Sequence, residues 1–159
     1  MNIFLVAPHP FYKERGTPIA VKLLAETLSE FGNKIDLLTY HEGTDVNIKG
    51  LRLFRIKKPP FCSNVPIGFS FKKVIADIYL TFHMLTLVRN NKYDVIHAVE
   101  ESIFPAVFIN FFLKKKLIYD MDSSMSEQLM EKWQGLSKLS NLSLFAFCIK
   151  FLYSLQKRL

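Results

Sequence analysis

The chain has 159 residues, half of them apolar, and 21 Lys and Arg against 14 Asp and Glu, a formal net charge of +7. This length fits one domain with a substantial core, and the apolar content excludes a globally disordered chain. The positive charge favours an acidic partner such as phosphate groups, nucleic acid or an anionic membrane face. Two cysteines far apart, Cys62 and Cys148, and the lack of a visible signal peptide indicate a reduced, cytoplasmic setting.

The first apolar run, residues 3–6, is short and rich in branched and aromatic side chains, which predicts a buried strand. Apolar residues then recur at the spacing of one helix face: Ala20, Leu24, Leu28 and Phe31. Thr17 is the predicted N-cap of this helix, Pro18 its first residue, and Gly32 its left-handed end. A strand therefore feeds a loop that leads into a helix start.

That loop lies where an open α/β sheet binds its ligand, at the carboxyl end of a strand and facing a helix N-terminus. Gly16 would let the backbone approach a ligand closely, and Lys13 and Arg15 add positive charge beside it. A tight turn with solvated charges explains the same residues equally well. Neither G-x-G-x-x-G nor the P-loop motif occurs, which argues against an NAD domain and a P-loop NTPase.

The remaining elements alternate along the chain. Strands are predicted over residues 34–39, 51–56, 93–98 and 117–121, and Pro59 and Pro60 end the second of these. Helices are predicted over 68–91 and 103–112, and Ser123 or Ser124 caps a further helix. The apolar residues of the longer helix fall three and four apart: Phe71, Ile75, Ile78, Phe82, Leu85 and Val88. This order is typical of an α/β fold with a mostly parallel, Rossmann-like sheet covered on both faces.

Residues 137–159 form an apolar segment with four basic residues and no acidic one. The segment is too short and too interrupted for a confident membrane span. Two interpretations stay open: a helix buried against a domain that follows, and a helix lying at a membrane interface.

Polar side chains follow two further strands. His97 closes the strand over residues 93–98 and precedes Glu100 and Glu101, while Asp122 and Ser123 come after the strand over 117–121. Carboxyl ends of parallel strands converge on one crevice, so these groups are candidates for a site. An ordinary core histidine and plain helix caps are the alternative interpretations.

Several classes of site receive little support. His9, His41, His83 and His97 lack paired metal-ligand spacing, so no metal is predicted. No G-x-S-x-G nucleophile elbow is present. The cations are spread over many elements without interleaved aromatic residues, so nucleic acid is not an expected partner.

Taken together, the segments resemble the N-terminal domain of family 4 glycosyltransferases of the GT-B fold. The resemblance rests on the strand at 2–6 with its loop through Gly16, the helix end followed by strand 34–39, the Tyr-Asp-Val-Ile-His segment at 93–97, and residues 117–124. It covers essentially the whole chain in the right order. Asn33 stands where this family usually has a histidine, and Asp122 stands where a histidine near the reacting centre is common.

The resemblance implies retaining transfer of a sugar from a nucleotide sugar to a carbohydrate or lipid-linked acceptor, without a further cofactor. It places the donor diphosphate against Gly16 and Thr17, gives catalytic roles to His97 and Asp122, and assigns acceptor binding to Lys13, Arg15, Glu100 and Ser123. It also implies that residues 1–136 are the Rossmann-like N-terminal domain and that 137–159 lead towards a C-terminal donor-binding domain. Without that domain the chain is expected to be inactive.

The expected location is cytoplasmic, with a peripheral position at the inner, anionic face of the membrane through residues 137–159 as a further expectation. The alternative function is a non-catalytic α/β module that binds a phosphorylated ligand or a membrane surface.

Overall fold

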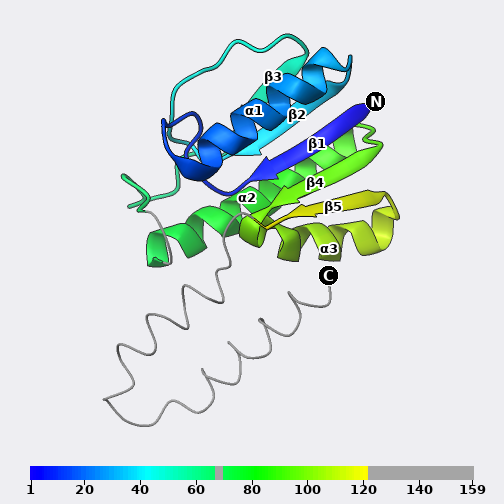
Figure 1. Cartoon of the computed structure of the whole chain (residues 1–159). Coiled ribbons are helices and arrows are strands. Elements are labelled where there is room, and N and C mark those ends of the chain that lie inside the picture. Colours follow the sequence, from blue (N-terminus) through cyan, green and yellow to red (C-terminus); the bar gives the residue numbers. More distant parts are fainter. Residues whose placement is uncertain (67–69, 122–159) are drawn as a thin grey trace.

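The structure is a computed structural model that describes residues 1–66 and 70–121. Five parallel strands form one sheet in the order β3-β2-β1-β4-β5 (Figure 1). The strands are β1 (Asn2–Ala7), β2 (Lys34–Thr39), β3 (Leu51–Arg55), β4 (Val95–Val99) and β5 (Lys116–Asp120). The helices are α1 (Gly16–Glu30), α2 (Phe71–Asn90) and α3 (Ile103–Leu113), with a single 3-10 turn, η1 (Glu100–Ser102), before α3. The predicted α/β class with a parallel sheet is confirmed.

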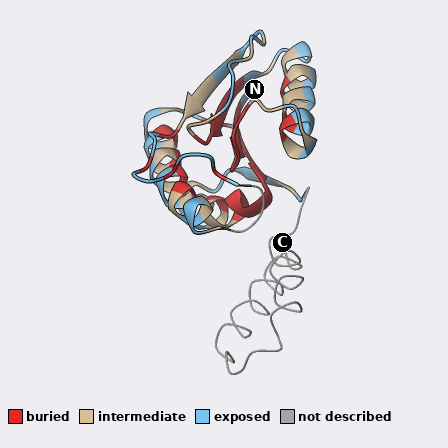
Figure 2. Ribbon diagram, turned by 90° about the vertical axis from the view of Figure 1, so that its left-hand side faces the viewer, coloured by how far each residue is buried: buried red, intermediate tan, exposed pale blue. Residues whose placement is uncertain are grey.

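Helices cover both faces of the sheet, and the buried strands lie between them (Figure 2). On one face, α1 packs through Val21 and Ala25 against Leu5 and Leu37. The opposite face holds α2 and α3, whose buried side chains pack with those of β1, β2 and β4. Alternate residues of each strand serve the two faces, because successive side chains point to opposite sides of a sheet. The sheet is thus the centre of a three-layer domain.

The C-terminal end of α1 is the one that the sequence predicts. Gly32 adopts a left-handed φ of 74° and donates its N–H to the Ser29 carbonyl at 2.8 Å. The N–H of Asn33 reaches the Leu28 carbonyl at 3.2 Å. These two bonds are those of a Schellman motif, which leads the chain directly into β2.

The predicted start of α1 is wrong by two residues. The N-cap is Arg15, with extended backbone, and the helix begins at Gly16. Thr17 lies inside the first turn, and its hydroxyl does not cap the helix but bonds elsewhere, as described below. Pro18 is still tolerated there, because the first four N–H groups of a helix have no partner within it.

Both predicted apolar stripes need correction. In α1 the buried residues are Pro18, Val21 and Ala25, whereas Ala20 and Phe31 are exposed. In α2 the buried residues are Ala76, Leu80, Met84 and Leu87. The side chains of Phe71, Ile78 and Phe82, predicted to face the core, are 78%, 50% and 67% exposed. Helical periodicity was right, but these helices carry apolar residues on more than one face, so spacing alone could not select the buried one.

Several predictions fall outside the described residues. These are the helix capped by Ser123 or Ser124, the boundary between 1–136 and 137–159, and the placement of Asp122, Ser123 and Cys148. Within residues 1–66 and 70–121, none of the helices has the length and apolar character needed to cross a membrane.

Candidate functional site

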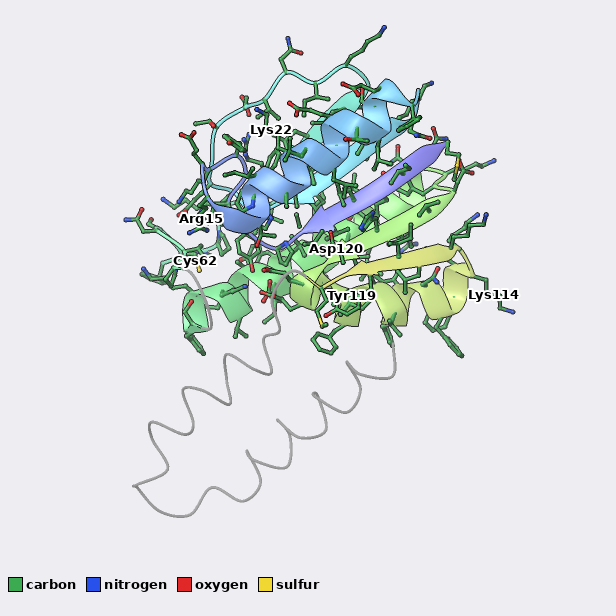
Figure 3. The ribbon with its side chains drawn as sticks, viewed as in Figure 1. Arg15, Lys22, Cys62, Lys114, Tyr119 and Asp120 are labelled. Carbon is green, nitrogen blue, oxygen red and sulfur yellow. The ribbon has the colours of Figure 1, made fainter. Side chains whose placement is uncertain are left out.

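The start of α1 and the end of β4 meet at the carboxyl edge of the sheet. The Thr17 hydroxyl donates a hydrogen bond of 3.2 Å to Oε1 of Glu100. Ser102 Oγ donates to the Val6 carbonyl at 3.1 Å and to the Val99 carbonyl at 2.7 Å. Arg15 and Asp120 both lie towards this edge, whereas Lys114 lies at the other end of the layers (Figure 3). The structure thus brings two of the predicted site residues, Thr17 and Glu100, into contact.

Gly16 is the first residue of α1 and is exposed. A Cβ built on Gly16 would meet no atom of the described chain within 4 Å, and its φ is not left-handed. The folded chain itself therefore places no demand on glycine at this position. Free N–H groups of the first helical turn, beside Gly16, form an exposed, electropositive surface.

The loop before α1 is held in place by the segment after β2. The N–H of Phe11 donates to the Glu42 carbonyl at 3.0 Å, and Tyr12 and Thr44 exchange two backbone bonds of 2.9 and 3.1 Å. Gly43, with φ of 119°, allows this contact, because a Cβ there would lie 2.1 Å from the Phe11 carbonyl oxygen. The loop is thus a fixed feature of the site.

Within the described residues, the loop cation Lys13 forms a salt bridge and the loop cation Arg15 forms none. Lys13 Nζ lies 3.7 Å from Oε2 of Glu42. Arg15 contributes its carbonyl to the first helical bond, to the Ile19 N–H at 3.1 Å. Both side chains keep part of their surface exposed at the carboxyl edge, where they can contact an anion.

Beneath Thr17 lies a buried polar cluster formed by Tyr40, Lys73, Asp77, Glu100 and Glu101, of which only the two glutamates were noted from the sequence. Lys73 Nζ pairs with a carboxylate oxygen of Glu101 and lies 4.0 Å from Oε2 of Glu100. The Tyr40 hydroxyl donates to Asp77. Because Tyr40 directly follows β2 and the other residues come from α2 and η1, only the folded sheet brings them together. Paired glutamates after a strand and a lysine in the first turn of a helix were the available signal.

Burial controls the charge of this cluster. Burial, and then the charge of Glu101, raise the pKa of Asp77 to about 7, and Lys73 opposes that rise. The pKa of Glu101 is also raised, mainly by burial. Glu100 adopts a left-handed φ of 50°, which is uncommon for a residue with a Cβ and turns the chain sharply after β4. The ammonium group of Lys73 thus stabilises the ionised forms of Asp77 and Glu101, which burial disfavours.

His97 is buried in the middle of β4, rather than at its end as predicted. Its Nε2 lies 4.0 Å from Oδ2 of Asp120, the last residue of β5. Burial lowers the pKa of His97, and the nearby Asp120 carboxylate opposes that shift. Among the residues that the structure describes, Nε2 has no hydrogen-bond partner. A neutral imidazole in this position can exchange a hydrogen bond with a ligand that reaches the sheet.

The arrangement suits an anionic ligand with hydroxyl groups. Helix amides at Gly16 and the cations Lys13 and Arg15 can bind a phosphate group, and His97 with the acidic groups nearby can bind hydroxyls. Over residues 1–66 and 70–121 no group of three or more His, Cys, Asp or Glu side chains is placed to hold a metal ion.

Comparisons with known proteins identify the fold. No family model and no curated protein matches the chain. Among solved structures, the chain is similar to a sucrose-phosphate synthase from Thermosynechococcus elongatus, with a TM-score of 0.59 and 17% sequence identity. The match covers 74% of this chain and 32% of that one, so the chain spans about a third of its neighbour's length.

The neighbour is a glycosyltransferase of the GT-B fold. At this identity the likeness concerns the fold alone, and in that respect the predicted resemblance to a GT-B glycosyltransferase domain is confirmed. The roles predicted for individual residues are not tested by the likeness and remain predictions.

Proposed function

We propose that the chain is the acceptor-side, N-terminal domain of a retaining glycosyltransferase that uses a nucleotide sugar. The observation that carries the proposal is the hydrogen bond between Thr17 and Glu100, in a sheet with the fold of a GT-B domain. This bond joins the start of α1 to the turn that follows β4. The pair lies beside an exposed Gly16, where a diphosphate would meet free backbone N–H groups.

Glycosyl transfer places developing charge on the departing diphosphate and on an oxocarbenium-like sugar. Gly16 and Thr17 would stabilise the diphosphate through the first turn of α1. One helix start supplies only part of that stabilisation, so a C-terminal donor-binding domain would supply the rest. The 159-residue chain alone is therefore proposed to be inactive.

The acceptor would lie against the neighbouring strand ends. His97 is proposed to contact the reacting hydroxyl, and its lowered pKa keeps the imidazole neutral and able to accept a proton. Lys13, Arg15 and Glu100 would orient the acceptor by charge and hydrogen bonds. Asp122 as a second catalytic group and Ser123 as an acceptor contact complete the proposal, and both lie outside the described residues.

The proposed acceptor is a carbohydrate or a lipid-linked glycan, met at the cytoplasmic face of a membrane. The net charge of +7 supports an anionic surface or phosphate-bearing substrates as partners. No cofactor beyond the nucleotide sugar is required by this chemistry.

The test uses the protein encoded by the complete reading frame, incubated with a panel of nucleotide sugars and with glycan or lipid-linked acceptors. Release of nucleoside diphosphate is measured, and the anomeric configuration of the product is read by NMR. Acceptor-dependent release with retained configuration supports the proposal. Inversion of configuration contradicts the retaining mechanism, and release that is insensitive to Gly16→Val contradicts the phosphate role of the loop.

A further inference from the structure

A cluster of exposed aromatic and basic side chains lies beside the carboxyl edge of the sheet and contains no residue of the proposed site. It consists of the loop after β3 and the first half of α2. We call it the basic aromatic rim and define it by seven residues: Lys57, Lys58, Phe61, Phe71, Lys72, Val74 and Ile78.

The loop and the helix of the rim are joined by side-chain contacts. Lys72 Nζ donates to the Ser63 carbonyl at 2.8 Å, and Cys62 Sγ contacts the Lys72 carbonyl oxygen at 3.6 Å. Cys62 lies at the same end of the molecule as Arg15, far from Lys114 (Figure 3). The rim therefore borders the end of the sheet where the site lies.

The rim exposes apolar surface without packing it. Phe61 is 97% exposed and Phe71 78% exposed, and Ile78 follows two turns later on the same helix. Phe61 also adopts a left-handed φ of 59°, which costs energy for an aromatic residue and here yields no burial. Large exposed apolar groups of this kind mark a surface that binds a partner.

A hollow of about 280 Å³ continues this surface between α2 and α3. Val74 and Ile78 of the rim form one wall, and Phe104 and Pro105 of α3 form the other. Its lining is mainly apolar, although Asp77 and Glu101 also border it, and it offers space to a hydrocarbon chain next to the rim.

The exposed charges of the rim itself have one sign. The rim contains three exposed lysines, Lys57, Lys58 and Lys72, and no acidic residue. Phenylalanines set among lysines complement an anionic lipid surface, where the rings enter the headgroup region and the cations contact phosphates.

The same charge argues against two other occupants. A second copy of the chain, meeting this one about a twofold axis, would bring the lysines of the two rims face to face. Residues 137–159 of the chain carry four basic residues and no acidic one, so they too have the sign of the rim. An anionic bilayer is the occupant that the charge favours.

We infer that the basic aromatic rim docks the protein on an anionic membrane and presents the carboxyl edge of the sheet to the bilayer. The inference deepens the proposed function by naming the membrane-contacting residues. Docking itself does not depend on the proposed function; only the reason for docking, delivery of a lipid-linked acceptor, rests on it. Docking would bring a lipid-linked acceptor to the edge that holds Thr17 and Glu100.

The test is flotation of the full chain with vesicles of phosphatidylcholine, with and without about one third phosphatidylglycerol. We expect binding to the anionic vesicles alone, and weaker binding at high salt. The double variant Phe61→Ser/Phe71→Ser should reduce partitioning about tenfold. The double variant Lys57→Gln/Lys58→Gln should reduce it roughly thirtyfold, because both cations act near the surface.

Matched controls come from the opposite end of α3. Phe111 and Phe112 are 75% and 70% exposed, so Phe111→Ser/Phe112→Ser removes comparable apolar surface away from the rim. Lys114→Gln/Lys115→Gln removes the same charge there. Both controls should change partitioning by less than about threefold. Circular dichroism of every variant checks that the fold is retained.

Binding that survives in the rim variants, or that falls equally in the controls, overturns the inference. So does failure of the wild-type chain to float with anionic vesicles at low salt, or a dimer that the rim phenylalanine variant dissociates. Vesicle binding involves no sugar chemistry, so loss of transfer with normal flotation would contradict the proposed function and leave the docking surface intact.

Discussion

Lys73 provides a prediction that depends on the buried cluster beneath the site. Its side chain is 13% exposed, and those of Glu100 and Glu101 are 8% and 6% exposed. Lys73→Met keeps most of the apolar volume but leaves these carboxylates, with Asp77 nearby, without their cation. Removing one partner of a buried pair costs about 3 to 5 kcal/mol, and we expect about 3 kcal/mol at pH 8.

The pH dependence distinguishes this cause from lost packing. The pKa of Asp77 rises from 3.8 to about 7 on folding, so the native state holds this proton more tightly than the unfolded state. The stabilisation that comes from protonated Asp77 is fully present below about pH 4 and is lost as the pH rises to about 7. That shift corresponds to about 4 kcal/mol. Lys73 opposes the rise for Asp77 and Glu101, so its removal raises both pKa values further.

The cost of Lys73→Met should therefore fall to about 1 kcal/mol at pH 5, where Asp77 is protonated in both proteins. Urea unfolding followed by far-ultraviolet circular dichroism at pH 5 and pH 8 measures the difference. The control is Lys72→Met, since Lys72 bonds an exposed carbonyl of Ser63. Equal losses at the two pH values, or an equal loss in the control, would refute the electrostatic reasoning.

Three further substitutions test separate parts of the structure. Arg52→Ala should cost about 2 kcal/mol in urea unfolding, because it removes bonds of 2.7 and 2.6 Å to the buried Asp36; an unchanged midpoint would contradict this. Gly43→Ala should lower the free energy of unfolding by about 3 kcal/mol, because its Cβ would overlap the Phe11 carbonyl. Thermal unfolding measures this loss, and a much smaller one would show that the loop shifts to make room. His97→Ala should impair transfer to the acceptor and spare donor hydrolysis, and unchanged acceptor KM and kcat would count against that role.

The fold could be predicted from the sequence to a large extent, because strand composition and helical spacing are local properties. The bounds predicted for β2 are those observed, and the Gly32 turn has its expected conformation. The buried face of α2 could not be predicted, since Phe71 and Phe82 satisfy helical spacing as well as Leu80 and Met84 do. Amphipathic spacing identifies a helix, but a Phe-rich sequence leaves its orientation undetermined.

The site was predictable only in part. Gly16 and Glu100 become candidates through the rule that ligands bind at the carboxyl ends of parallel strands, and Thr17 through the resemblance to family 4 glycosyltransferases. The hydrogen bond from Thr17 to Glu100 was not predicted, because the two residues lie 83 positions apart in the sequence. Lys73 joins the same cluster through contacts between α2 and η1, which are far apart in the sequence, so the local signals could not show that they meet.

The central claim is that the exposed start of α1 binds the diphosphate of a nucleotide sugar, and Gly16→Val tests it most directly. A side chain at Gly16 meets no described atom within 4 Å, so the fold should tolerate it while phosphate approach is blocked. Ala20→Val, at an exposed position one turn further along α1, is the matched control. In the protein encoded by the complete reading frame, we expect Gly16→Val to abolish release of nucleoside diphosphate and Ala20→Val to preserve it. Wild-type release from the folded Gly16→Val protein would contradict the account.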